Sequence, residues 1–184
     1  KAAVSNGDIP LKFTADIHEV TYTRVAGNGF EENDEVGVFA LVGSSTMKEE
    51  RYADNLRFFR TSEKVFESSE PIYYPYHEEG VNMGESTMSV AVETDQNLSA
   101  GYFCSDFLVA SQNLQSAPKG AIALHYDHKF FKLKIALVGK EGEELQGILD
   151  ADPKLSVCGF YTKAIYDFQK ETYSAFSNEK SITP

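Results

Sequence analysis

The sequence predicts an all-β protein, a β-sandwich with few or no helices, for three reasons. Segments in which apolar and polar residues alternate recur along the chain, and this period of two is typical of half-buried strands. Turn-forming residues separate the segments at roughly 8–12 residues, a spacing found in β-sandwiches. The aromatic residues comprise 13 Phe and 10 Tyr but no Trp, and aromatic and β-branched side chains favour pleated, half-buried surfaces.

The N-terminal half contains the clearest single strand. Every second residue of its first patterned segment is apolar: Leu11, Phe13, Ala15 and Ile17. Residues 36–42 form a continuous apolar run, which predicts a central strand covered on both sides. Residues 43–54 are polar and predict a long exposed loop. Further strands are expected at residues 20–23, 56–60, 71–76 and 88–92, and residues 104–112 fit either a strand or a helical turn, with the strand favoured.

The C-terminal half contains the strongest hairpin candidate. Its arms are residues 121–126 and 130–138, and lysines alternate with apolar residues in the second arm, which sets its register. Residues 155–161 and 164–168 predict two more strands, and no element is expected beyond Gln169. Because no amphipathic segment reaches about 12 residues, no long helix is expected.

Length and charge limit the class of protein. The chain of 184 residues suits one domain with a full hydrophobic core. We expect residues 1–8 to be a polar leader and residues 9–184 to be a single β-sandwich domain. The formal net charge of −11 repels phosphate backbones, so nucleic-acid binding is not expected. No apolar stretch approaches the ~20 residues of a transmembrane helix, so no transmembrane segment is expected.

Sequence motifs for catalysis are absent. The chain has neither G-x-S-x-G, nor a P-loop, nor G-x-G-x-x-G after a strand, so neither an enzyme nor a cofactor is expected. His125 and His128 lie three residues apart, but on a strand they face opposite sides, so no metal site is expected. Cys104 and Cys158 lie in apolar segments, which favours buried free thiols and leaves a disulfide open.

Two further features are candidates for binding and processing. Tyr73, Tyr74 and Tyr76 can form an aromatic platform for sugar rings, although packing at a strand edge is the commoner use of such a run. Arg24 precedes a loop of small residues and is a candidate site for trypsin-like cleavage. The alternative is an ordinary surface arginine.

The order of these features resembles the fimbrillin-like proteins of Bacteroidetes. Residues 30–39 are similar to a family segment in which an aromatic residue precedes Gly-Asp and Val-Gly-Val-Phe, with Asn33 in place of the family's glycine. No single piece is diagnostic, but the pieces occur in family order along most of the chain. They lie at residues 11–17, 23–24, 30–39, 55, 72–75, 95–96, 105–110, 128–133, 157–159 and 164–168.

The resemblance implies a transthyretin-like, Greek-key β-sandwich that serves as a building block of fimbriae. Proteins of the family are exported as lipoproteins, anchored at the outer membrane, and assembled at the cell surface into a fimbrium, or pilus, that mediates cell adhesion. In some members an arginine-specific protease cuts an early loop and releases the first strand, whose place a strand of a neighbouring subunit takes. By this resemblance Arg24 is the processing site. The exchanged strand then contains Leu11, Phe13, Ala15 and Ile17.

The family usually carries a second β domain after the first, and the chain ends about where that domain would begin, so we expect the C-terminal domain to be absent. The main hypothesis is therefore a non-catalytic structural or adhesive subunit whose partners are other fimbrial subunits. The second is a carbohydrate-binding module of a surface lipoprotein, with surface proteins or glycans as partners and the three tyrosines as its platform. The sequence leaves the ligand, and a stalk, tip or anchor position, open.

Overall fold

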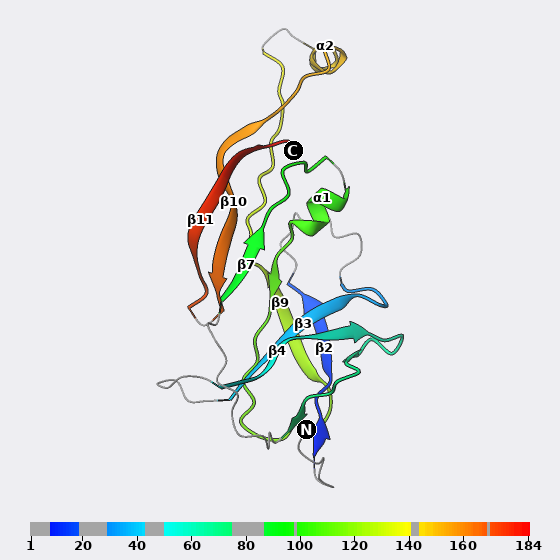
Figure 1. The fold of residues 1–184 in the computed structure, drawn as a ribbon. Helices are drawn as coiled ribbons and strands as arrows, with labels where there is room; N and C mark the ends of the chain where they lie inside the picture. Colours follow the sequence, from blue (N-terminus) through cyan, green and yellow to red (C-terminus); the bar gives the residue numbers. More distant parts are fainter. Residues whose placement is uncertain are drawn as a thin grey trace. The chain divides into compact units, whose positions relative to one another are not determined.

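The computed structural model describes residues 8–18, 29–42, 50–74, 87–97, 99–140, 144–168 and 170–184 (Figure 1). These residues form eleven strands and two short helices, which confirms the prediction of a β-rich protein with few helices. The chain divides into two compact units. Unit 1 comprises Lys1–Glu85 and Leu108–Asp127, and unit 2 comprises Ser86–Phe107 and His128–Pro184.

Unit 1 contains two sheets. The larger sheet has six strands in the order β3-β4-β5-β2-β9-β8, and the smaller pairs β1 with β6. The β1–β6, β2–β5, β3–β4 and β4–β5 pairs are antiparallel, whereas β2 and β9 pair in parallel. The strands are β1 (Ile9–Pro10), β2 (Phe13–Ile17), β3 (Glu35–Val42), β4 (Glu50–Arg60), β5 (Phe66–Glu67), β6 (Tyr73–Tyr74), β8 (Leu108–Val109) and β9 (Ile122–His128).

The core of unit 1 is aromatic and draws on segments that are far apart in the sequence. Phe58 and Phe66 are fully buried, and the ring of Phe13 meets that of Phe58 edge to face at 5.1 Å. Edge-to-face contact is a preferred geometry for aromatic pairs. The buried members of this core are Leu11, Phe13, Ala53, Phe58, Phe66, Ile72 and Ile122.

A tight turn leads into β3 and explains one departure from the family pattern. The backbone N–H of Asp34 donates to the carbonyl of Glu31, and the Asp34 carboxylate accepts from the N–H of Glu31 at 2.6 Å. Asn33 has φ of 72°, in the left-handed region. Glycine enters that region without steric cost and asparagine tolerates it better than most residues. Asn33 therefore fits the position where the similar family segment has glycine.

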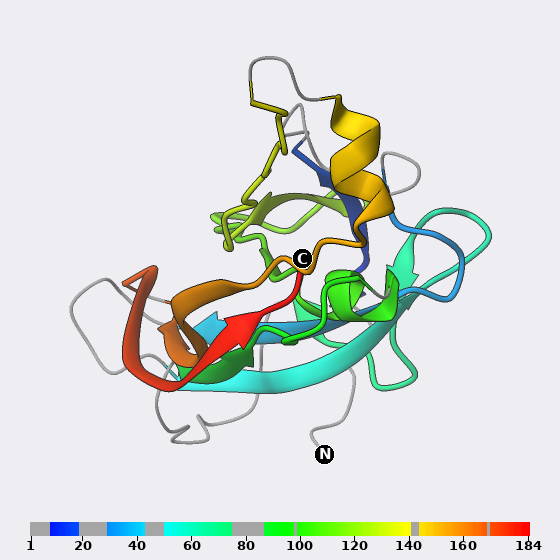
Figure 2. The same ribbon diagram turned by 90° about the horizontal axis from the view of Figure 1, so that it is seen from above.

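Unit 2 contains one three-stranded antiparallel sheet in the order β11-β10-β7. Its long strands β10 and β11 run side by side (Figures 1 and 2). A short polar network fixes α1 beside the sheet, because the Gln96 side chain donates to the hydroxyl of Ser105 at 2.8 Å and to the carbonyl of Glu93 at 2.7 Å. The elements are β7 (Thr87–Ala91), α1 (Ser99–Cys104), α2 (Leu145–Asp150), β10 (Val157–Asp167) and β11 (Thr172–Ile182).

The predicted hairpin of residues 121–126 and 130–138 is wrong. Its first arm is part of β9, but residues 131–140 lie outside every strand and helix. In the sheet of unit 1, β9 already has β2 on one side and β8 on the other, so neither of its edges is open to a third strand. Alternation predicts which side chains share a face, but it does not specify the hydrogen-bonding partner.

The C-terminal strands also differ from the prediction. The two strands expected at residues 155–161 and 164–168 are one strand, β10. Thr162 interrupts the apolar pattern and yet is buried. Its hydroxyl has partners there, because it donates to the backbone carbonyl of Asn178 and accepts from the side-chain amide of Asn178. The polar segment after Gln169 forms β11, an edge strand whose side chains are mostly exposed.

Three predictions in the first half and middle of the chain need correction. In the described sheet β3 is an edge strand rather than a central one, and its described side chains are exposed or half-buried. The expected loop at residues 43–54 ends earlier, because β4 begins at Glu50. At residues 104–112, where a strand is favoured over a helical turn, the structure has the end of α1 followed by the short β8. The strand expected at residues 20–23 lies outside the described residues.

Candidate functional site

The predicted exchanged strand, β2, lies inside the six-stranded sheet of unit 1. Five of its residues pair in parallel with β9, from Phe13 opposite Ile122 to Ile17 opposite Tyr126. On its other side, β2 pairs with β5 through Phe13 and Phe66 alone. The strand is therefore held mainly by one neighbour, β9.

The apolar residues of the predicted exchanged strand divide into two classes of burial. Leu11 and Phe13 are 5% and 6% exposed and belong to the core. Ala15 and Ile17 are half-buried, and Ala15 packs against the core from its margin. If β2 left, β9 would present unpaired backbone groups along one edge and the core would open where Leu11 and Phe13 had been. This place suits a replacement strand with apolar residues at alternate positions.

The solvent side of the β2–β9 pair carries two carboxylate–imidazole contacts. Asp16 Oδ1 lies 2.6 Å from His125 Nδ1, and Asp127 Oδ1 lies 2.9 Å from His18 Nδ1. The two imidazole rings stack, with centroids 5.8 Å apart and planes inclined by 12°. These contacts add to the backbone pairing between the same two strands.

The structure describes two of the three platform tyrosines. Tyr73 and Tyr74 form β6, pair with Pro10 and Ile9 of β1, and are half-buried. Tyr74 also packs against the core of unit 1, so part of its ring serves structure. Tyr76 and Arg24 lie outside the described residues. The sugar platform and the processing site stay predictions.

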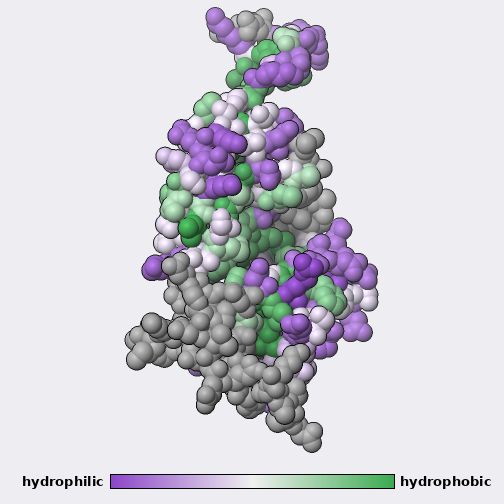
Figure 3. All heavy atoms as spheres, viewed as in Figure 1, coloured by the Kyte–Doolittle hydropathy of each residue, from purple (hydrophilic) through white to green (hydrophobic). Residues whose placement is uncertain are grey.

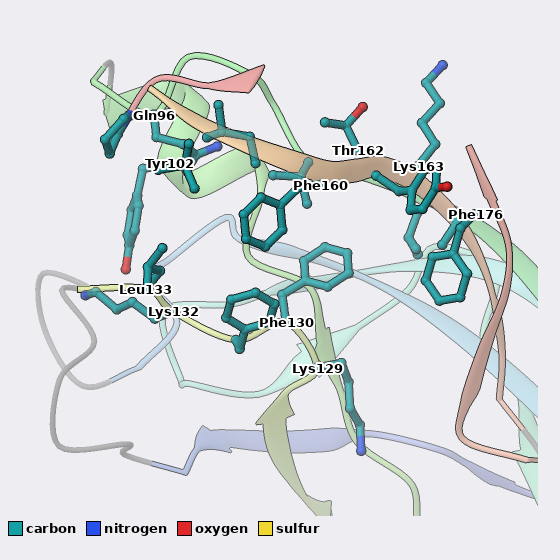
Figure 4. Close-up of a pocket in the computed structure, with 18 of the residues that line it drawn as sticks. Gln96, Tyr102, Lys129, Phe130, Lys132, Leu133, Phe160, Thr162, Lys163 and Phe176 are labelled. Carbon is teal, nitrogen blue, oxygen red and sulfur yellow. The ribbon is translucent and has the colours of Figure 1, made fainter. Parts of the chain in front are cut away.

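Unit 2 contains an apolar cavity of about 500 Å³. On one side lie residues of β7, β10 and β11, and on the other lies the segment that follows β9. Figure 4 shows Phe160 and Phe130 pointing toward one another across it, with Lys132 and Lys129 on the same segment as Phe130. This volume and this apolar lining are typical of a binding pocket. Its aromatic lining residues are Tyr102, Phe130, Phe131, Phe160, Tyr161, Tyr173 and Phe176.

The segment at residues 131–140 forms one wall of the cavity and exposes much apolar surface. Phe131 is 75% exposed and Val138 is 82% exposed, and apolar side chains appear at the surface of unit 2 in Figure 3. Leu133, Ile135 and Leu137 are also exposed. Large exposed apolar patches mark interaction surfaces in soluble proteins. The alternation that predicted a strand here thus belongs to a segment outside every strand and helix, whose apolar residues are exposed.

One end of the cavity is fixed by the half-buried Tyr173. The hydroxyl of Tyr173 donates to the backbone carbonyl of Lys129 at 2.7 Å, and the Lys129 ammonium lies 3.3 Å from a carboxylate oxygen of Glu171. Burial, with a smaller contribution from Tyr166, raises the pKa of Tyr173 to about 12. Tyr173 is therefore neutral at physiological pH and acts as a donor.

The polar candidates from the sequence lie apart from one another. His125 is exposed, whereas the side chain of His128 is almost buried, so the prediction that the two face opposite sides is confirmed. His128 Nδ1 lies 2.6 Å from Asp106 Oδ1. Cys104 and Cys158 are free, but both are exposed, so the expectation of burial is wrong. Within the described ranges, no three or more His, Cys, Asp or Glu side chains are grouped to hold a metal ion.

Sequence reasoning did not find the unit 2 cavity. Its lining residues come mainly from β7, α1, β10, β11 and the segments that follow β7 and β9, and the sequence assigned no element to β11. The only local signal was the unusual apolar alternation of residues 131–137.

None of the described helices is long and apolar enough to span a membrane.

Comparison with known proteins identifies a family. The model of the Fimbrillin-like family matches residues 23–184, which is most of the chain and leaves out β2. No curated protein and no solved structure matches the chain. The predicted resemblance is confirmed, and the chain belongs to the fimbrillin-like family.

Proposed function

We propose that this protein is a non-catalytic structural subunit of a cell-surface fimbria. Family membership supports this function, because it suggests a fimbrial or adhesive role and its members are typically structural. The finer proposal is an adhesive subunit with a transthyretin-like Greek-key sandwich, derived from a lipoprotein precursor of the outer membrane.

Assembly is proposed to occur by strand exchange at β2. The observation that carries this proposal is the position of β2, which has five residues paired with β9 but one residue paired with β5. A strand bound mainly along one edge can be replaced by a donor that satisfies the same backbone groups and refills the positions of Leu11 and Phe13. Cleavage after Arg24 would separate this strand from the rest of the chain.

The experiment is N-terminal mass spectrometry of surface material sheared from producing cells. A chain that begins at Val25 in a high-molecular-weight filament fraction is the expected result. An Arg24→Ala variant should keep its N-terminal strand and form no filaments, while Arg24→Lys distinguishes an arginine-specific protease from a general trypsin-like one. An intact chain in material free of filaments would contradict strand exchange and favour the binding-module hypothesis.

The apolar segment at residues 131–140 offers a second test of assembly. Because Phe131 is 75% exposed, Phe131→Asp should leave the monomer folded and yet oppose burial of this surface in a filament. Ala136→Asp is the matched control, because it adds the same charge at an exposed position of the same segment. We expect filament yield to fall several-fold for Phe131→Asp and less for Ala136→Asp. Equal filament yields from the two variants would show that this segment is not part of the assembly surface.

A further inference from the structure

The walls of the cavity in unit 2 are held in place by contacts between aromatic rings. The ring of Phe130 lies against those of Phe107 and Tyr173, with centroids 5.6 and 5.9 Å apart. Tyr173 donates from its hydroxyl to the backbone carbonyl of Lys129, which ties β11 to the segment after β9. A site whose walls are already fixed binds a ligand without paying the entropy of ordering them.

The size and lining of the cavity suit an alkyl chain. Its volume of about 500 Å³ lies within the range of about 300–1,000 Å³ typical of small-molecule sites. A methylene group is about as large as a water molecule, which takes about 30 Å³ in the liquid, so roughly 16 such groups fit. In Figure 4 the lining residues run from Tyr102 past Phe160 and Phe130 to Phe176, so the cavity suits an elongated ligand.

One end of the cavity carries a cation that is positioned by an aromatic ring. The Lys132 ammonium lies 5.2 Å from the centroid of the Tyr102 ring, within the range of a cation–π contact. Figure 4 shows these two side chains at the opposite side of the cavity from Phe176. An ammonium has three hydrogen-bond donors, so it can serve a ligand carboxylate in addition to other partners.

The charge of the lining also favours an anion. The described residues that line the cavity include Lys129, Lys132 and Lys163 but neither aspartate nor glutamate, although the chain has 28 acidic and 17 basic residues. A carboxylate oxygen of Glu171 lies 3.3 Å from the Lys129 ammonium, so Lys129 already has an anionic partner. The local excess of cations beside an apolar space suits a ligand that is both anionic and apolar.

We propose that the cavity of unit 2 binds an alkyl carboxylate of the fatty-acid class. The alkyl chain lies between Phe130 and Phe160, and the carboxylate accepts hydrogen bonds from the Lys132 ammonium. The proposal goes beyond fimbrial assembly and does not depend on it, since the lining residues belong to unit 2 and the strand proposed to be exchanged belongs to unit 1.

The test is calorimetric titration of sodium octanoate, decanoate and dodecanoate into the full chain, each below its micelle concentration. Each added pair of methylene groups should tighten binding about tenfold, because each buries a similar apolar area. Lys132→Ala should weaken decanoate binding about fivefold and leave decanol binding unchanged, because only decanoate is charged. Lys134→Ala is the matched control, since Lys134 is exposed on the same segment but is not among the lining residues.

A second pair of variants locates the ligand in the cavity. Ile135 lines the cavity and its neighbour Ala136 does not, although both side chains are exposed. Ile135→Asp puts a carboxylate on the wall, which opposes both an apolar chain and an anion, so decanoate should bind at least tenfold more weakly. Ala136→Asp adds the same charge outside the lining and should change the affinity little.

Three results would overturn the proposal. The first is the absence of saturable binding for all three carboxylates. The second is an affinity that does not depend on chain length or on the charge at position 132. The third is binding in the cavity of a peptide of residues 9–18 that decanoate does not displace, because the cavity would then accept a strand. Each of these titrations has its outcome whether or not the chain forms filaments, so the site and the proposed function fail separately.

Discussion

Replacing Phe13 by alanine tests the position of β2 directly. The Phe13 side chain is 6% exposed, meets Phe58 edge to face at 5.1 Å, and pairs across the backbone with Phe66 and Ile122. A buried aromatic side chain removes about 150–250 Å² from water. At about 25 cal/mol per Å², this burial is worth at most about 4–6 kcal/mol.

An alanine at position 13 still buries part of that apolar surface, but it leaves a cavity among the neighbouring aromatic rings. We therefore expect Phe13→Ala to lower the free energy of unfolding by about 3–5 kcal/mol. Urea titration followed by circular dichroism measures this loss. Thr14→Ala is the matched control, because Thr14 is exposed on the same strand and its replacement should change stability by less than about 0.5 kcal/mol. A loss below about 1 kcal/mol for Phe13→Ala would mean that β2 does not occupy the core.

Three further predictions concern local conformation and titration. Asn33 has φ of 72°, so Asn33→Val should cost about 1–2 kcal/mol and Asn33→Gly little, measured by thermal unfolding. Burial raises the pKa of both Tyr126 and Tyr173 to about 12, whereas tyrosines of the unfolded chain ionise near about 10. The unfolded state loses these protons first, so stability should fall as pH rises from about 10 to about 12, measured by urea titration at each pH. A Cβ at Gly101 would lie 1.9 Å from the carbonyl oxygen of Asp95, whereas one at Gly147 would meet no atom within 4 Å. Gly101→Ala should therefore destabilise unit 2, and Gly147→Ala should strengthen α2 by about 1 kcal/mol, measured by hydrogen exchange.

Each of these predictions has a result that would contradict it. Equal stability of the Val and Gly variants at Asn33 would mean that the turn relaxes. Stability that stays constant from pH 10 to pH 12 would mean that neither the buried Tyr126 nor the half-buried Tyr173 has a raised pKa in the folded state. Unchanged unfolding of Gly101→Ala would show that α1 can move away from Asp95.

The residues that carry the family resemblance prove to be structural. Gln96 and Ser105 join α1 to its surroundings, and Asp106 contacts His128. Phe107 packs edge to face on Tyr166, with ring centroids 5.2 Å apart. Each makes a local contact that is sensitive to residue type, which explains why the sequence alone revealed the family.

The errors in the strand predictions share one physical origin. The apolar pattern of residues 131–137 is that of a strand, yet β2 and β8 already occupy both edges of β9. The polar pattern after Gln169 is not that of a buried strand, yet the backbone pairs with β10 over most of its length. Backbone hydrogen bonds form strands regardless of whether the side chains are buried, so an exposed edge strand leaves little trace in the pattern.

The sequence by itself determined the β-rich class, the family, and the absence of familiar catalytic motifs, because these depend on residue type and local spacing. Only the tertiary structure decided which strands are neighbours. It brought Asp16 and His18 to His125 and Asp127, and it assembled the cavity of unit 2 from segments that are far apart in the sequence. The physical reason is that pairing between distant strands depends on register and on which edges are still open, and neither is encoded in any one segment.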